Sequence, residues 1–158
     1  MTVVAVPEVG CQNKRESEDR CRVYRSEFGL DAHIVPRTGA IHLSAISMSA
    51  VLISPALGRA VVELLDAVPA FSIDRRGHRL WALLGDAPVS QDDADRAKRL
   101  LFKVGAIPVL WNATVVLPTP GNPHRVWLHP PRGRARPALA AIGQAITTAV
   151  SRDAGLNR

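Results

Sequence analysis

The stretch AFSIDRRGHRLWALL, residues 70–84, decides the fold of this chain. It predicts a β-hairpin in which strands over 70–74 and 78–84 flank the turn Asp74-Arg75-Arg76-Gly77. Aspartate at the first position and glycine at the fourth suit a type I turn. Because residues 80–84 are apolar at every position, both faces of the second strand need cover, so we expect a central strand with a helix on at least one face.

The chain before this hairpin predicts further helices and strands. Residues 1–14 combine little apolar periodicity with proline and glycine, which indicates a disordered segment. An amphipathic helix is expected from Ser17 until Gly29 stops it. The remaining elements expected here are strands over 32–35 and 40–43 around the turn Pro36–Gly39, a strand over 46–53, and a helix that Ser54 caps and that ends near Asp66.

The chain after the hairpin begins with a helix that Ser90 is expected to cap. Its first-turn aspartates complement the helix dipole, and Asp92 with Arg96 and Asp95 with Arg99 are spaced as i,i+4 ion pairs. The elements expected over this half are a helix over 91–104, strands over 107–110, 114–117 and 125–129, a proline-rich loop over 118–123, and a final helix from Pro137 to Val150.

This order of elements indicates an α+β fold with a mostly antiparallel sheet and about four helices. The chain has 158 residues, of which 47% are hydrophobic, enough for a globular domain with a substantial core. We therefore expect a single domain over residues 15–158, with a basic proline- and arginine-rich segment at 130–137.

The charge balance favours anionic partners. Twenty basic residues outnumber fourteen acidic ones, which gives a net charge of +6 and a sequence pI of about 10.3. Nucleic acid or an acidic protein would suit such a surface. Arginine dominates the basic residues, as it also does in chains from GC-rich genomes, so charge alone leaves the partner open.

Cysteine usage and the amino terminus indicate a cytoplasmic protein. Cys11 and Cys21 do not make a disulfide framework in a domain of this size. The first residues lack the basic region and the uninterrupted apolar run of a secretory signal, since Pro7 breaks the run. The longest uncharged stretch contains His42 and Pro55 and predicts strands and a helix start, so we expect no membrane partner.

Catalytic and metal-binding patterns are weak. Asp92, Asp93 and Asp95 lie at a helix start, where the dipole accounts for them without a metal ion. His33 and His42 are expected to be cross-strand neighbours, on the opposite face from Ile34 and Ile41. Two imidazoles are too few for a usual zinc site. Without a nucleophile elbow, Walker loop or dinucleotide fingerprint, the sequence favours a non-catalytic protein without a cofactor and leaves enzyme activity open.

The segment HPPRGRARP, residues 129–137, is the clearest candidate for a contact surface. Its prolines favour extended backbone, which would hold the arginine side chains in water. Pro131, Arg132, Gly133 and Arg134 resemble an AT-hook, although Ala135 stands where that motif has proline. The resemblance implies binding in the narrow minor groove of A·T-rich DNA. The nucleic-acid-binding set expected from the sequence comprises Arg132, Gly133, Arg134 and Arg136, extended by phosphate contact or stacking at Arg75, Arg76, Arg125 and Trp127.

Four segments carry a broader resemblance: CRVYRSEFGL at 21–30, HRLWALL at 78–84, VVLPTP at 115–120 and VWLHPP at 126–131. Together they resemble a group of small actinobacterial proteins. The last two segments are also similar to the carboxy-terminal part of bifunctional primase-polymerase domains. This chain lacks the strand-borne Asp-x-Asp pair with which that family binds metal, so the resemblance implies a non-catalytic derivative.

Two functional classes follow from the sequence. The first is a non-catalytic, cytoplasmic nucleic-acid-binding or nucleoid-associated accessory protein. The second is a protein-interaction or regulatory module, or a homodimer, that docks through its carboxy-terminal helix. The second class depends on whether the apolar stripe of that helix packs on its own domain, as we expect of such a stripe, or on a partner. The stripe consists of Leu139, Ile142, Ile146 and Val150, beside a face of small residues at Ala141, Ala145 and Ala149.

Overall fold

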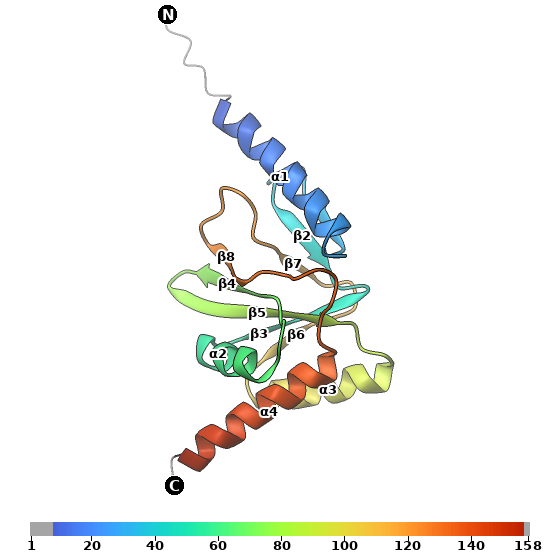
Figure 1. The fold of residues 1–158 in the computed structure, drawn as a ribbon, viewed down its shortest axis with the longest axis vertical. Coiled ribbons are helices and arrows are strands. Elements are labelled where there is room, and N and C mark those ends of the chain that lie inside the picture. The colour runs from blue at the N-terminus through green and yellow to red at the C-terminus, as the bar shows by residue number, and fades with distance from the viewer. Residues whose placement is uncertain (1–7, 157–158) are drawn as a thin grey trace, which may run out of the picture.

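The computed structural model describes residues 8–156, with side chains described from Asn13 to Gly155. In this part of the chain, four helices and two antiparallel sheets form a single α+β domain, which confirms the predicted fold class (Figure 1). No helix within it combines the length and the apolar character needed to cross a membrane. The elements are α1 (Glu8–Ser26), β1 (Ala32–Ile34), β2 (Ile41–Ser44), β3 (Met48–Ile53), α2 (Pro55–Leu64), β4 (Ala70–Arg75), β5 (His78–Asp86), α3 (Gln91–Lys103), β6 (Ile107–Val109), β7 (Thr114–Val116), β8 (Arg125–His129) and α4 (Leu139–Leu156).

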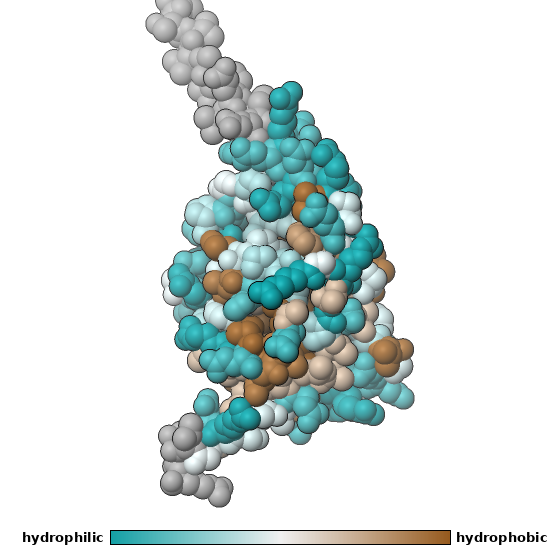
Figure 2. All heavy atoms as spheres, viewed as in Figure 1, coloured by the Kyte–Doolittle hydropathy of each residue, from teal (hydrophilic) through white to brown (hydrophobic). Residues whose placement is uncertain are grey.

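The larger sheet has the strand order β6-β3-β5-β4-β8, so β5 lies at its centre. Residues 81–85 of β5 are all buried, which confirms the predicted central strand with cover on both faces. Helices α2, α3 and α4 cover one face, where Val51, Leu83 and Ile142 are fully buried. Apolar surface gathers over α2 and its junction with α4, whereas the surface over α1 is mostly hydrophilic (Figure 2).

The other face of this sheet packs against α1 and a smaller sheet of order β1-β2-β7. Tyr24, Leu43 and Phe71 meet in the core between these layers. The two sheets share a corner, because β2 continues into β3 and β6 into β7 through short connections. Backbone bonds from Ala45 N to Ala113 O (2.9 Å) and from Asn112 N to Ala45 O (3.1 Å) hold this corner.

The turn between β4 and β5 is shorter than the predicted one. Arg75 pairs with His78, so only Arg76 and Gly77 connect the strands, with φ of 51° and 80°. Left-handed backbone at both positions makes this a two-residue turn of the I′ class. The predicted type I turn is therefore wrong, because the twist of the paired strands favours the I′ geometry over the local preference of aspartate and glycine.

Helix α1 begins at Glu8, well before the predicted start at Ser17. Residues 8–14 of the segment expected to be disordered are helical here, while residues 1–7 lie outside the described residues. The amino-terminal half of α1 projects beyond the body of the domain (Figure 1), and its exposed turns carry no apolar stripe that could have predicted a helix. Cys21 is a buried free thiol whose pKa is raised by that burial, and the side chain of Cys11 lies outside the described part.

Helix α4 begins at Leu139 and not at the expected Pro137. The carbonyl of Pro137 instead accepts a hydrogen bond from Asp86 N (2.9 Å), which keeps this residue beside the end of β5. Ile142 and Ile146 are fully buried, which confirms that α4 belongs to the domain. Gly85 permits this approach, since a Cβ there would lie 2.7 Å from Cδ1 of Ile142. Three residues of the apolar stripe of α4, Leu139, Ile142 and Ile146, are thus packed in the domain's own core, and Val150 is partly buried beside them.

Helices α2 and α3 begin at the predicted caps. Oγ of Ser54 accepts from Leu57 N, and Oγ of Ser90 accepts from Asp93 N (3.1 Å). The expected i,i+4 ion pairs of α3 do not form among the described residues. Asp95 instead accepts a hydrogen bond from the side chain of Gln91 (2.9 Å), while Asp93 accepts from Val89 N (3.1 Å). The basic side chains of α3 consequently remain without acidic partners in this part of the chain.

Candidate nucleic-acid interface

Two arginines of the basic segment turn back onto the end of α1. Nη2 of Arg134 donates to Ser26 O (2.9 Å), and Nη1 of Arg136 donates to Phe28 O (3.0 Å). These oxygens lie at the carboxy-terminal end of the helix, where carbonyl groups lack intrahelical partners and the helix dipole favours cations. The two guanidinium groups therefore stabilise the junction between α1 and the rest of the domain.

The predicted solvated arrangement of this segment holds for only part of it. Arg132 and Gly133 are exposed, and Gly133 turns the backbone with φ of 69°. Arg134 is exposed as a residue, but its guanidinium is engaged by Ser26 O. For Arg136 the prediction is wrong, because its side chain is 11% exposed and also pairs with Asp86 (3.5 Å). The unpaired carbonyls of α1 and the Asp86 carboxylate compete successfully with water for these arginines.

A cleft of about 680 Å³ separates α1 from the edge strand β8, and we call it the β8 cleft. Glu16, Asp19, Arg20 and Val23 form its helical wall. Residues 118–120 and Tyr24 form its floor, and Arg125, Val126 and Trp127 form the strand wall. The structure thus brings Arg125 and Trp127, two of the residues singled out in the sequence, to one side of a cleft.

Trp127 is anchored at its polar edge and along its ring. Its Nε1 donates to the Tyr24 hydroxyl (2.9 Å), which in turn donates to Pro118 O (2.6 Å). Burial raises the pKa of Tyr24, so this hydroxyl keeps the proton that it donates. The ring also meets Tyr24 and Phe71 edge-on, with centroids 6.0 and 5.3 Å apart. Because Trp127 remains partly exposed, it presents a held aromatic surface to the cleft.

The guanidinium of Arg125 has no anionic partner among the side chains that the structure describes, those of residues 13–155. Its Nε is buried without a hydrogen bond, and no described carboxylate pairs with it. Arg125 pairs across the sheet with Ile73 of β4, and Arg75 lies two residues further along that strand. Burial, and to a lesser degree the charge of Arg75, lower the pKa of Arg125. A partly buried cation without a counter-ion is unfavourable, so an anion bound here would stabilise it.

The helical wall of the cleft carries both signs of charge. Asp19 is paired with Arg22 at 3.0 Å, which offsets part of its charge. Arg20 lies close enough to lower the pKa of Tyr24 slightly against the larger effect of burial. Glu16 adds an acidic group on the same helix. An anionic ligand would therefore lie on the β8 side of the cleft, near Arg125.

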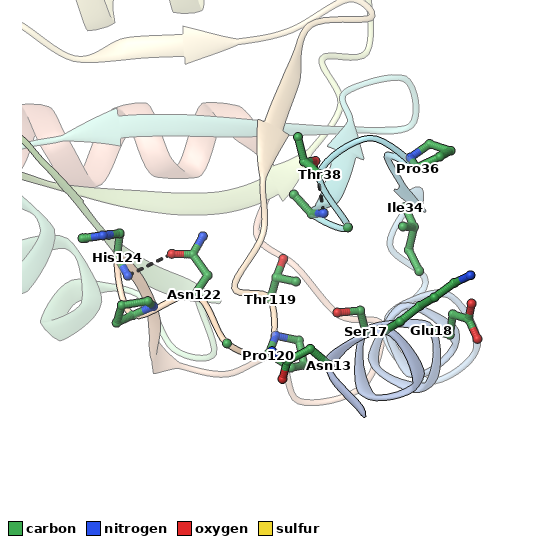
Figure 3. A pocket seen from close by; sticks show the side chains of 15 residues that line it. Asn13, Ser17, Glu18, Ile34, Pro36, Thr38, Thr119, Pro120, Asn122 and His124 are labelled. Carbon is green, nitrogen blue, oxygen red and sulfur yellow. Dashed lines mark hydrogen bonds between the residues drawn. The ribbon is translucent and has the colours of Figure 1, made fainter. Parts of the chain in front are cut away.

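A second hollow of about 760 Å³ lies beyond residues 119–120, beneath the amino-terminal half of α1 (Figure 3). Two of the polar side chains that line it stabilise loops. Oγ1 of Thr38 accepts from Ala40 N (3.2 Å), and Oδ1 of Asn122 accepts from His124 N (3.0 Å). Lys14 is the lysine or arginine that lines this hollow, whereas Arg20 and Arg125 line the β8 cleft.

Arg75 and Arg76 occupy the tip of the β4–β5 hairpin. Both are exposed, and the left-handed backbone of Arg76 belongs to the turn itself. Arg75 lies two residues along β4 from Ile73, which pairs with Arg125 on the neighbouring strand. The hairpin tip therefore adds positive charge on the β8 side of the cleft, near Arg125.

The predicted histidine pair is confirmed. His33 pairs with His42, and Ile34 pairs with Ile41, with the two imidazole centroids 5.9 Å apart. Burial, the charge of His33 and the charge of Arg125 lower the pKa of His42 in that order. Over the described part of the chain, no group of three or more histidine, cysteine, aspartate or glutamate side chains could hold a metal ion.

Sequence reasoning missed the helical wall of the cleft, including Arg20 and the Tyr24 hydroxyl. The distribution of charge along the sequence does indicate where basic residues are concentrated. The stretch 96–152 contains nine arginine and lysine residues and no aspartate or glutamate. It supplies Arg125 and Trp127 to β8, and also the basic end of α3.

Neither protein-family models, nor curated proteins, nor solved structures gave a match to this chain.

Proposed function

We propose that this protein is a non-catalytic, cytoplasmic nucleic-acid-binding accessory protein that holds a single strand along the β8 cleft. The observation that carries this proposal is the partly buried Arg125 guanidinium. It has no anionic partner among the described residues and lies on the same strand as the partly exposed Trp127. A phosphate would supply the missing counter-charge, and a base would cover the exposed part of the Trp127 ring.

This pairing of groups matches the chemistry of single-stranded nucleic acid. Proteins that bind single strands combine a basic groove along the phosphates with aromatic rings on which bases stack. Stacking is tolerant of sequence, because every base presents a π face. Arg125 and Arg75 would contact phosphates, Trp127 would stack, and Arg76 at the exposed hairpin tip would lengthen the track.

Minor-groove binding through the basic segment has weaker support. An AT-hook needs both arginines of its core to lie extended on either side of the glycine. Here Gly133 turns the chain, and Arg134 is bonded to Ser26 O. We therefore assign the main contact to the β8 cleft, with exposed Arg132 as an accessory phosphate contact.

The alternative proposal, docking of a partner through α4, also has less support. Leu139, Ile142 and Ile146 of its apolar stripe are buried in the domain's own core. A partner could reach these side chains only if α4 were displaced from α2 and β5. Such displacement would expose a large part of the apolar core.

Fluorescence anisotropy with a labelled oligothymidylate tests the proposal. We expect binding to the single strand to exceed binding to A·T-rich and G·C-rich duplexes, and to weaken between about 50 and 200 mM salt. Arg125→Ala should lower the affinity about tenfold, equivalent to roughly 1.4 kcal/mol. Arg152→Ala, an exposed arginine on α4, is the matched control and should change little.

Indole N–H signals in NMR spectra add an internal control. The oligonucleotide should shift the Trp127 signal, while Trp81, which is 7% exposed, should not respond. Equal affinities of the Arg125→Ala and Arg152→Ala variants would refute the proposal. So would tighter binding to A·T-rich duplex that depends on Arg132 and not on Arg125.

A further inference from the structure

The β6 edge of the five-stranded sheet exposes a series of large apolar side chains. We call it the β6 strip and define it by Phe102, Ile107, Trp111 and Ile46, which are 62%, 49%, 44% and 59% exposed. Isolated apolar residues are common on protein surfaces, but several at one sheet edge indicate a contact surface. Aromatic side chains are also enriched among the residues that dominate protein-protein binding.

The fold brings these four residues to one edge. Phe102 lies in the last turn of α3, and Ile107 begins β6 after a short turn. Trp111 follows the end of β6. The bond from Asn112 N to Ala45 O (3.1 Å) places the Trp111 turn beside Ile46. Along the chain, these positions therefore run from the end of α3 through β6 to the corner between the two sheets.

The backbone at Trp111 is unfavourable for a bulky residue. Trp111 and Asn112 have φ of 49° and 64°, and Ala113 N bonds to Leu110 O (3.2 Å) across them. Asparagine and glycine adopt such a turn readily, whereas a large side chain is strained there. Trp111 is also 44% exposed, so only part of the residue is packed against the domain. Strain of this kind is often retained where the side chain has a role in binding.

The charged residues that neighbour Phe102 most closely along α3 are basic. Lys98, Arg99 and Lys103 lie in the last turns of α3, next to Phe102 in the helix. No described carboxylate pairs with any of them. The stretch 96–152, which includes α3 from Arg96 onward and the whole of β6, contains no acidic residue. The complementary surface is therefore apolar in the middle and acidic around it.

We propose that the β6 strip docks an amphipathic helix of a partner protein, with large apolar side chains on one face and acidic residues flanking them. A helix fits better than an added strand, because β6 has only three residues and Pro108 at its centre offers no N–H. A second copy of this chain fits poorly, because a symmetric contact would bring the basic groups of α3 toward the same groups of the other copy.

The β6 strip and the β8 cleft are independent sites. In the strand order β6-β3-β5-β4-β8 they occupy opposite edges of one sheet. A protein helix at one edge and a nucleic-acid strand at the other would not compete for the same residues. The β6 proposal does not rest on the proposed nucleic-acid function, and either can fail without the other.

The test uses two synthetic helix-forming peptides rich in leucine and glutamate. In the first, leucine recurs at i, i+3, i+4 and i+7; the second has the same composition with the leucines scattered. The full chain should bind the first peptide at least tenfold more tightly, with a shift of the Trp111 indole signal and none of Trp81 or Trp127. Phe102→Ala and Trp111→Asn should each weaken binding at least fivefold, whereas Val89→Ala, at a site 91% exposed, should not.

Trp111→Asn also separates binding from folding. Asparagine suits the left-handed turn, so this variant should melt no lower than the unchanged protein while it loses the peptide. Equal binding of both peptides, or insensitivity to both variants, overturns the proposal. Two further outcomes overturn it: Phe102-dependent dimers in sedimentation experiments would assign the strip to a second copy, and Trp111-dependent binding to phosphatidylserine vesicles without peptide binding would assign it to a lipid surface.

Discussion

The two edges of the five-stranded sheet each expose a tryptophan, but the fold holds the two rings in different ways. Trp127 lies in strand β8, donates a hydrogen bond to Tyr24 and packs edge-on against two aromatic rings. Trp111 lies in a strained turn after β6 and is 44% exposed. The Trp127 side chain thus packs against the core and is also partly exposed, whereas the Trp111 side chain lies largely at the surface.

The basic side chains at the two edges also differ in how far they are buried. At β8, the Arg125 guanidinium is partly buried, and its pKa is lowered mainly by that burial. At β6, Arg99 and Lys103 are exposed. A bound anion therefore changes the energy of a desolvated group at β8, while at β6 it meets solvated side chains that guide a partner more than they hold it. We expect mutations to separate the two edges by their effect on stability as well as on binding.

The largest expected difference is in how much the Trp127 and Trp111 rings contribute to the free energy of unfolding. Trp127→Ala should lower the free energy of unfolding by about 3 kcal/mol, because it leaves a cavity beside Phe71 and removes a hydrogen bond to Tyr24. Urea unfolding monitored by circular dichroism measures this change. A loss of less than about 1 kcal/mol would show that Trp127, like Trp111, is only loosely tied to the core.

The basic segment next to the β8 edge should divide into structural and surface arginines. Arg136→Ala removes the bond to Phe28 O and the pairing with Asp86, so we expect a loss of about 1 to 2 kcal/mol. Arg132→Ala should change stability by less than about 0.5 kcal/mol, since Arg132 is exposed. Thermal melts of the two variants check this order. Equal melting temperatures would mean that the solvated arrangement predicted from the prolines is correct after all.

Trp111→Asn is expected to change stability in the opposite direction from Trp127→Ala. Placing asparagine in the left-handed turn should raise the free energy of unfolding by about 0.5 to 1 kcal/mol. The same urea experiment measures it, with Val89→Ala as the control for loss of an exposed apolar side chain. A clear destabilisation would show that the Trp111 ring contributes packing that outweighs the backbone strain.

The smallest expected effect is a pH dependence at His42, in β2 of the smaller sheet. Its pKa is lowered by burial and by the charges of His33 and Arg125, so the unfolded chain takes up this proton at higher pH than the folded protein. Stability should therefore fall as pH drops through about 6.5, and the loss is complete below the folded pKa. His42→Gln should reduce the slope of melting temperature between about pH 7.5 and 5.

His78→Gln, which replaces an exposed histidine of β5, is the matched control for the substitution itself. Nucleic acid bound at Arg125 should also raise the pKa of His42, since it would offset the charge that now opposes protonation. NMR titration of the His42 ring with and without oligothymidylate measures this shift. An unchanged pKa in the presence of bound oligonucleotide would place the ligand away from Arg125.

Much of the fold could be predicted, because its signals are local. Apolar runs identified β5 as the central strand, and serine residues marked the starts of α2 and α3. The register of the first hairpin followed from the length of its turn, so His33 was correctly placed opposite His42. Each of these features depends on a few neighbouring residues and on the period of a helix or strand.

Less of the candidate site could be predicted, because its residues meet through long-range contacts. Arg125 and Trp127 were singled out, but the helical wall that makes a cleft beside them comes from the other end of the chain. The tie between Arg136 and Phe28 O joins residues 108 positions apart. No local rule connects a basic segment with the carbonyl groups of a distant helix end.

The sequence by itself determined the order of helices and strands, the central position of β5 and the positive charge of the chain, because side-chain period and composition act at short range. Only the tertiary structure decided which arginines are available to bind an anionic ligand. The packing of α1 and of the turn after it brought the carbonyls of Ser26 and Phe28 to Arg134 and Arg136 and left Arg125 without an anion among the described residues. A guanidinium binds whichever oxygen the fold places beside it, and that placement is set by the packing of distant segments.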